Sequence, residues 1–164
     1  MSSKLKKLGT SKEIITQKNN FKIAIVVSEY YFDEINKQLL KGCYETLIYN
    51  KINHQNISIE YVPGAFELTS GAQLVLEKYK SDAVITLGCV IKGDTDHDKY
   101  INSAVANGLT NLSIQYKKPF IFGLLTPNTM KQAKERSGGK KGNKGIEVAE
   151  ACLKMLLLMQ KLKK

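Results

Sequence analysis

Apolar residues along this chain recur with two periods, one typical of strands and one typical of helices. Three apolar runs, at residues 22–28, 83–87 and 120–125, are typical of strands buried in a sheet. Residues 57–61 alternate between apolar and polar side chains and predict a further strand. The pattern therefore predicts four strands.

Helical periodicity separates these strands, because apolar residues recur there every three or four positions. A short helix is expected to begin at Thr126 as N-cap with Pro127 as its first residue, to run to Arg136, and to end at Ser137. The residues expected to face inward from the longer helices are Ile35, Leu39, Cys43 and Leu47, then Leu68, Ala72, Val75, Leu76 and Tyr79, then Ile101, Ala104, Val105 and Leu112, and last Ile146, Ala149, Leu153, Leu156 and Leu157.

Strands that alternate with helices predict an α/β fold, in which right-handed crossovers place helices on both faces of a parallel sheet. We expect one domain at residues 21–164, preceded by a flexible arm at residues 1–20, where no period is visible. The carboxyl ends of parallel strands meet at one edge of the sheet, where ligands bind. The loops that reach this edge are residues 28–33, 62–67, 88–97 and 122–127.

The composition narrows the function. A chain of 164 residues that is 43% hydrophobic suits one globular domain. The apolar run from Met155 to Met159 is far too short to span a membrane, and no apolar stretch follows the N-terminal lysines, so we expect no membrane segment and no secretory signal. Three widely spaced cysteines, Cys43, Cys89 and Cys152, are typical of reduced thiols in a cytoplasmic protein.

The net charge of +10 raises the question of a nucleic-acid partner. Much of the excess lies near the termini, where solvated lysines are common, and the basic residues are not interleaved with aromatics. We therefore expect no nucleic-acid binding. Of the 25 basic residues only Arg136 is an arginine, which is either an incidental surface residue or a bidentate ligand for phosphate or carboxylate.

Residues 82–98 combine a buried strand, a loop and a helix start, and such a junction gathers ligands. His97, one of two histidines, is either a general acid or base or a packed helix-start residue. The turn at residues 93–95 is either an anion cradle of backbone N–H groups or an ordinary turn. Cys89 lies in an apolar run, which favours a packed cysteine over a nucleophile.

The remaining candidates are aromatic. Tyr30, Tyr31 and Phe66 lie in strand-end loops and either stack on a flat ring or cover the edge of the core. The glycine-rich motifs of nucleotide sites do not occur, and no cysteine or histidine cluster has metal-ligand spacing, so we expect no cofactor and no metal.

Five blocks carry a resemblance to a known family: VPGAFE at 62–67, LGCVIKGDTDH at 87–97, FGLLT at 122–126, QAKERSG at 132–138 and GNKG at 142–145. Together they resemble lumazine synthase (6,7-dimethyl-8-ribityllumazine synthase) in sequence, order and spacing from about residue 21 to 160. The resemblance implies a flavodoxin-like, three-layer α/β/α sandwich. It also implies a transferase that condenses 5-amino-6-(D-ribitylamino)uracil with 3,4-dihydroxy-2-butanone 4-phosphate in riboflavin biosynthesis, without a cofactor.

The resemblance also implies roles for individual residues. It assigns proton transfer to His97. It assigns the ribitylaminouracil to residues that stack on the ring, read its edge, hold the ribityl chain or line the pocket from a neighbouring subunit: Tyr30, Ala65, Phe66, Glu67, Cys89, Val90, Ile91 and, from the neighbour, Phe122. It assigns the phosphate to a turn, an arginine and a nearby lysine: Asp94, Thr95, Arg136 and Lys144.

The sequence departs from the family in the loop after the first strand. Tyr31 stands where the family usually has an asparagine, and the loop to Ile35 is one residue longer than usual. The stacking residue is therefore either Tyr30 or Tyr31. A non-catalytic flavin- or lumazine-binding relative of the same fold stays open as an alternative function.

The resemblance finally implies an assembly. Family members form homopentamers, and some close into icosahedral shells of sixty subunits. The glycine-rich segment at residues 138–145 resembles the kink of shell-forming members, where glycine permits a sharp bend. We expect a pentamer and leave the shell open. Riboflavin synthase is a further partner that the resemblance allows.

Overall fold

The computed structural model describes residues 13–15 and 19–163 and confirms the α/β architecture. Its main sheet has four parallel strands, in the order β2-β1-β3-β4. The central strands β1 (Ile23–Ser28) and β3 (Ala83–Cys89) are buried along their whole length, whereas β2 (Ile57–Val62) and β4 (Phe120–Leu125) are edge strands. A helix lies in every connection between these strands, as parallel pairing requires.

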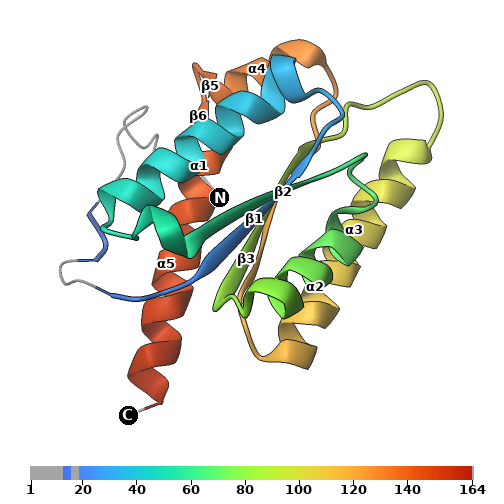
Figure 1. The fold of residues 1–164 in the computed structure, drawn as a ribbon. Coiled ribbons are helices and arrows are strands. Elements are labelled where there is room, and N and C mark those ends of the chain that lie inside the picture. Colours follow the sequence, from blue (N-terminus) through green and yellow to red (C-terminus); the bar gives the residue numbers. More distant parts are fainter. Residues whose placement is uncertain (1–12, 16–18, 164) are drawn as a thin grey trace.

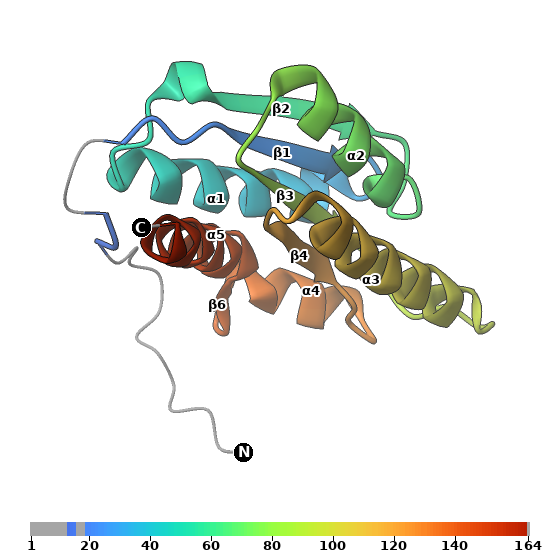
Figure 2. The same ribbon diagram turned by 90° about the horizontal axis from the view of Figure 1, so that it is seen from below.

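The helices form two layers around the sheet (Figure 1). One face is covered by α1 (Lys37–Tyr49) and α5 (Lys144–Leu162), and the other by α2 (Leu68–Tyr79) and α3 (His97–Tyr116). Figure 2 shows α5 beside α1 and, across the sheet, α3 beside α2. The predicted three-layer sandwich is therefore confirmed.

Both faces of the sheet are apolar, which explains the continuous hydrophobic runs of the central strands. In β1, Ile23, Ile25 and Val27 pack toward α1 and α5, while Ala24 and Val26 pack toward α2 and α3. The period of two thus divides one strand between two cores.

The connection from β1 to α1 is irregular. Residues 32–36 form η1 (Phe32–Asn36), a single π-helical turn, in which the N–H groups of Ile35 and Asn36 both donate to the carbonyl of Tyr31, at 3.0 and 3.1 Å. A π-turn holds one residue more than an α-helical turn. The turn therefore accommodates one residue more than an α-helical turn would, and the apolar stripe that begins at Ile35 continues into α1 as predicted.

The last helices are joined by a short hairpin that the sequence did not predict. After α4 (Met130–Arg136), strand β5 (Ser137–Gly139) pairs antiparallel with β6 (Gly142–Asn143), and α5 follows at once. Gly138 and Gly142 have φ angles of 124° and 86°, which side-chain-bearing residues rarely adopt. The expected sharp bend between the last two helices is present.

Two details of the predicted helices were wrong. The N-cap of α4 is Thr129, whose hydroxyl accepts from the Gln132 N–H at 3.2 Å, because Thr126 and Pro127 continue beside the chain that leaves β3. Ala104 is exposed, because the buried stripe of α3 passes through Leu109 and leaves Ala104 on its flank.

Most of the predicted N-terminal arm, residues 1–20, lies outside the described residues. Within the described part, Ile15 is buried, and the N–H groups of Ile14 and Ile15 both donate to Oδ1 of Asn50, at 2.6 and 3.1 Å. Asn50 follows the last residue of α1, so its amide ties this segment to the end of that helix. The 3₁₀ turn η2 (His54–Asn56) then leads into β2.

Candidate active site

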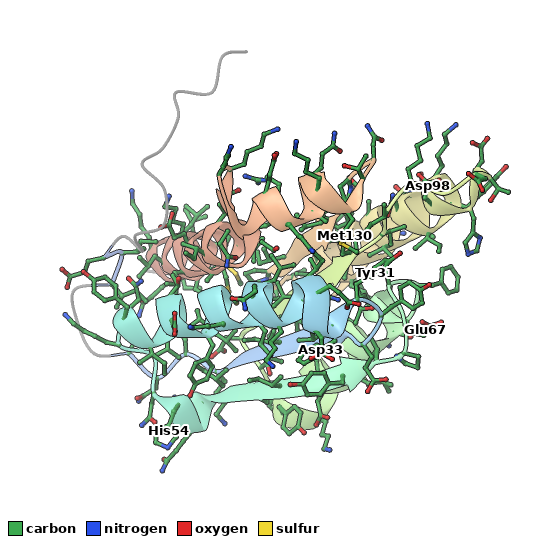
Figure 3. The ribbon with its side chains drawn as sticks, turned by 90° about the horizontal axis from the view of Figure 1, so that it is seen from above. Tyr31, Asp33, His54, Glu67, Asp98 and Met130 are labelled. Carbon is green, nitrogen blue, oxygen red and sulfur yellow. The ribbon has the colours of Figure 1, made fainter. Side chains whose placement is uncertain are left out.

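The order of the strands creates a switch point. The chain runs from β1 outward to β2 and then crosses back to β3 on the other side of β1, so the carboxyl ends of β1 and β3 lie where sheets of this kind bind their ligands. In Figure 3, Tyr31, Glu67 and Asp98 lie around this end of the molecule, and His54 lies at the opposite end. Of the two histidines, only His97 is therefore at the edge that carries the candidate residues.

The central strand β3 extends further than β1. It pairs with β1 only as far as Leu87 opposite Val27, but with β4 as far as Cys89 opposite Leu125. The chain after β1 turns away at Glu29, whose N–H donates to β2. One side of the backbone after Leu87 therefore has no strand beside it.

The residues that follow β3 continue the backbone hydrogen bonding of the sheet with the chain at and after the end of β4. The N–H groups of Val90 and Lys92 donate to the carbonyls of Leu125 and Pro127, at 2.9 and 3.0 Å. Ile91 lies between them and, by the alternation of an extended chain, presents its N–H to the side that β1 has vacated. Among the described residues this N–H has no backbone partner. Such an open edge can read the donors and acceptors of a planar ring.

Tyr30 and Tyr31 differ in their environment. The Tyr30 side chain is 64% exposed, while Tyr31 is half-buried and packs against the core. The two rings meet edge to face, with their centroids 4.7 Å apart. Burial raises the pKa of Tyr31, and the neighbouring Tyr30 and Cys89 raise it further. Tyr31 thus supports the ring of Tyr30, which stays accessible.

The loop after β2 reaches the same edge. Ala65 is buried and Phe66 is 60% exposed. Glu67 is half-buried and immediately precedes α2. The segment therefore presents one aromatic ring and one carboxylate at this edge of the sheet.

The turn between β3 and α3 is exposed from residue 92 to 97. His97 is the first residue of α3, and its N–H donates to the hydroxyl of Thr95 at 3.4 Å. Asp96 forms an ion pair with Lys99 at 2.8 Å. An accessible imidazole thus lies at the start of a 20-residue helix, whose free N–H groups favour an anion. Asp94 is also exposed there.

We call the candidates at the carboxyl ends of β1, β2 and β3 the strand-end group: Tyr30, Ala65, Phe66, Glu67, Cys89, Val90, Ile91, Asp94, Thr95 and His97. The other candidates lie elsewhere. A cavity of about 510 Å³ beside the edge strand β4 is lined by Phe122, Arg136 and Lys144, among others. We call these three residues the cationic group, after its two basic members. No member of the strand-end group lines this cavity.

Glu147, which sequence analysis missed, organises the cationic group. Its Oε1 lies 3.0 Å from Nη1 of Arg136, and its Oε2 lies 3.1 Å from Nη2 of Arg136 and 3.3 Å from Nζ of Lys144. Partial burial would raise the pKa of Glu147, but hydrogen bonds and charge from Arg136, with help from Lys144, outweigh it and lower the pKa. The spacing of Lys144 and Glu147 on one helix was a signal that could have found it.

The Cys89 thiol, possible metal ligands and possible membrane helices complete the description. Burial raises the pKa of the Cys89 thiol to about 12, so the thiol is protonated at neutral pH and is no ready nucleophile. Within residues 13–15 and 19–163, no group of three or more His, Cys, Asp or Glu side chains is placed to hold a metal ion. In the same part of the chain, no helix is both long enough and apolar enough to cross a membrane.

Known proteins resemble this chain over most of its length. The sequence model of the family described as 6,7-dimethyl-8-ribityllumazine synthase matches residues 20–160. A 6,7-dimethyl-8-ribityllumazine synthase of Parabacteroides distasonis is 48% identical over 134 residues, which cover 82% of this chain and 83% of the relative. Those of Leuconostoc mesenteroides and Porphyromonas gingivalis are 43% and 45% identical, over 91% and 83% of this chain and 95% and 84% of the relatives.

Proposed function

Because this chain belongs to the 6,7-dimethyl-8-ribityllumazine synthase family, we propose that it condenses 5-amino-6-(D-ribitylamino)uracil with 3,4-dihydroxy-2-butanone 4-phosphate. The products are 6,7-dimethyl-8-ribityllumazine, phosphate and water. The observation that supports the proposal is the switch point itself, because an accessible aromatic ring, an open backbone edge and an exposed histidine all lie at this end of the sheet. No observation favours the non-catalytic alternative.

The uracil ring binds at the strand-end group. Tyr30 stacks on the ring, and we prefer it to Tyr31 because its side chain is accessible whereas Tyr31 packs on the core. The backbone of residues 89–91 reads the ring edge, since no strand lies beside it on the side of β1. Phe66 and Glu67 hold the ribityl chain from the adjacent loop.

His97 moves the protons. The 5-amino nitrogen attacks the ketone carbon, and the carbonyl oxygen must gain protons before it departs as water. An imidazole suits this task because it titrates near neutral pH and both gives and takes a proton. The exposure of His97 at the start of α3 leaves its side chain accessible to the bound ketone.

Phosphate leaves in a later step, and positive charge stabilises it. Asp94 and Thr95 supply the turn at the helix start, while Arg136 and Lys144 belong to the cationic group in a separate cavity. We infer that the cationic group of one subunit completes the strand-end group of its neighbour. Such contacts make a ring, and we propose the homopentamer that the family resemblance implies.

We also propose a cytoplasmic location. Cys43, Cys89 and Cys152 are all buried and unbonded, which fits a reducing compartment.

The direct test mixes the purified protein with both substrates and follows lumazine fluorescence together with phosphate release. We expect both products to appear at equal rates, and neither to appear at that rate when the protein or one substrate is omitted. Folded protein that releases no phosphate and forms no lumazine would contradict the proposal.

A further inference from the structure

We propose that Asn36 is a positioning residue, which fixes the backbone of Tyr30 and thereby holds its ring in place for the uracil substrate. Asn36 is fully buried at the end of the π-helical turn η1. Its side-chain Nδ2 donates to the carbonyl of Ser28 and to the carbonyl of Tyr30, each at 2.8 Å. One amide therefore joins the last residue of β1 to the exposed aromatic residue. The inference rests on the proposed function.

The π-turn places this side chain. The N–H of Asn36 donates to the carbonyl of Tyr31 at 3.1 Å, and Tyr31 has a left-handed backbone with φ at 58°. Ile35 and Asn36 are consecutive, yet both are fully buried. The wider turn thus directs Ile35 into the core and Asn36 beneath the loop that carries Tyr30.

The chemistry of the contact selects an amide. Two carbonyl oxygens need two donors from one side chain, and the NH₂ group of asparagine supplies both. A serine or threonine hydroxyl has only one donor, and an aspartate carboxylate would face the carbonyls with negative charge. Because both acceptors are carbonyls, the orientation of the Asn36 amide is determined by its surroundings.

The Asn36 side chain is only partly satisfied by hydrogen bonds. Its Oδ1 is buried and has no hydrogen-bond partner among the described residues, as is also true of the neighbouring Ser28 hydroxyl. Buried polar atoms without partners lower stability, which offsets part of what the two hydrogen bonds of Nδ2 contribute. An apolar residue at this position could not donate hydrogen bonds to the carbonyls of Ser28 and Tyr30.

The Tyr30 ring has little other support. Its side chain is 64% exposed and meets the ring of Tyr31 edge to face. The position of the ring therefore depends on its backbone, and the Asn36 amide fixes that backbone. Loss of the amide is expected to leave the ring in several positions, which weakens binding of a planar substrate.

The experiment compares Asn36→Ala with Asn50→Ala. Asn50 is also fully buried and also joins backbone segments, but it does so at the far end of α1. We expect Asn36→Ala to raise the KM for the ribitylaminouracil by about 10- to 100-fold and to leave the KM for the phosphorylated ketone within about twofold. Asn50→Ala should lower the melting temperature and leave both KM values unchanged.

A second comparison separates positioning from general damage. In a Tyr30→Ala background, Asn36→Ala should have almost no further effect on the KM for the ribitylaminouracil, because both changes remove the same interaction. If Asn36→Ala does not fold, Asn36→Ser, which keeps one donor, is measured in the same way, and an intermediate rise is expected.

Equal changes in both KM values, or additive effects with Tyr30→Ala, would overturn the inference. An inactive wild-type protein would instead refute the proposed function. Equilibrium binding of the ribitylaminouracil alone to the same variants would then decide the role of Asn36 without turnover.

Discussion

The strand-end group and the cationic group are built on different principles. The strand-end group takes its shape from the backbone. Strand β3 extends beyond its pairing with β1, which leaves one side of its peptide groups open. The π-turn η1 and the left-handed backbone conformation of Tyr31 accompany the exposed ring of Tyr30. The second takes its shape from charge, because one carboxylate, Glu147, holds a guanidinium and an ammonium together beside an aromatic ring.

This difference fits the two tasks that we propose for the groups. A flat, neutral ring is recognised by precise placement of surfaces and peptide groups, which a rigid backbone provides. A phosphate is recognised by charge, which long side chains deliver and an internal counter-ion keeps in position. We therefore expect geometric changes to weaken binding of the uracil substrate and charge changes to weaken binding of the phosphorylated one.

The largest effect is expected from His97→Ala, which removes the proton carrier and leaves both binding surfaces intact. Turnover should fall by about 100-fold or more, with little change in either KM. The matched control is His54→Ala, because the second histidine lies at the opposite end of the molecule. Unchanged turnover in His97→Ala would contradict the proposed role of His97 in proton transfer.

The next largest effect tests whether the two groups meet between subunits. Arg136→Ala should be strongly impaired, like His97→Ala. If the two proteins are dissociated, mixed equally and reassembled, about a quarter of the interfaces would hold one intact group of each kind, and activity should recover to about a quarter of wild type.

The control for this mixing experiment pairs His97→Ala with Tyr30→Ala. Both substitutions lie in the strand-end group. Every interface therefore contains a substituted strand-end group, and activity should stay low. Failure of the first pair to recover, with subunit exchange verified by mass spectrometry, would place both groups in one subunit.

Arg136→Lys should have a smaller, selective effect. It keeps the positive charge but loses the planar fork that now meets both oxygens of Glu147. We expect the KM for the phosphorylated ketone to rise by about tenfold, with the KM for the uracil unchanged. Lys131→Ala removes an exposed charge from the same helix and should change neither value. A rise in both KM values for Arg136→Lys would indicate damage to the fold.

The smallest effect concerns stability. The pKa of Glu147 is lowered in the folded protein, so its ionised form adds stability above the ordinary carboxylate pKa of about 4.3, and this stability is lost as the pH falls through the folded pKa. Because Glu147 is 40% exposed, solvent screening limits the contribution to about 1 kcal/mol or less.

Glu147→Gln should therefore be slightly less stable than wild type at pH 7 and equal to it in strong acid, as measured by urea unfolding at both pH values. Glu45→Gln, at an exposed site on α1, should show no such difference. A stability gap that persists in acid would assign the effect of Glu147→Gln to packing rather than to charge.

The regular part of the fold was predictable because its signals are local. The bounds of β4 were predicted correctly, and those of β1 to within one residue, since a buried strand is a continuous apolar run. The end of β3 was predicted two residues early, because Gly88 looked like a break, whereas it packs closely against Leu68 and Leu124 and stays in the strand.

The site was only partly predictable. Tyr30 and His97 are visible in the sequence because strand-end loops and helix starts are visible. The roles of Asn36 and Glu147 are not, because each depends on partners that the fold brings together. The separation of Arg136 from His97 was also hidden, since both follow neighbouring strands and only the cavity shows that they face different surroundings.

The π-turn η1 has a consequence for how this protein can change over time. Because a π-turn differs from an α-helical turn by one residue, we expect that a residue lost from the loop after β1 would narrow this turn and leave the stripe from Leu39 to Leu47 in place against the sheet. The length of the loop at this edge of the sheet would then be independent of the packing of α1. The length of this loop, and with it the choice of ring that the loop accepts, could then change during evolution without compensating substitutions in the core.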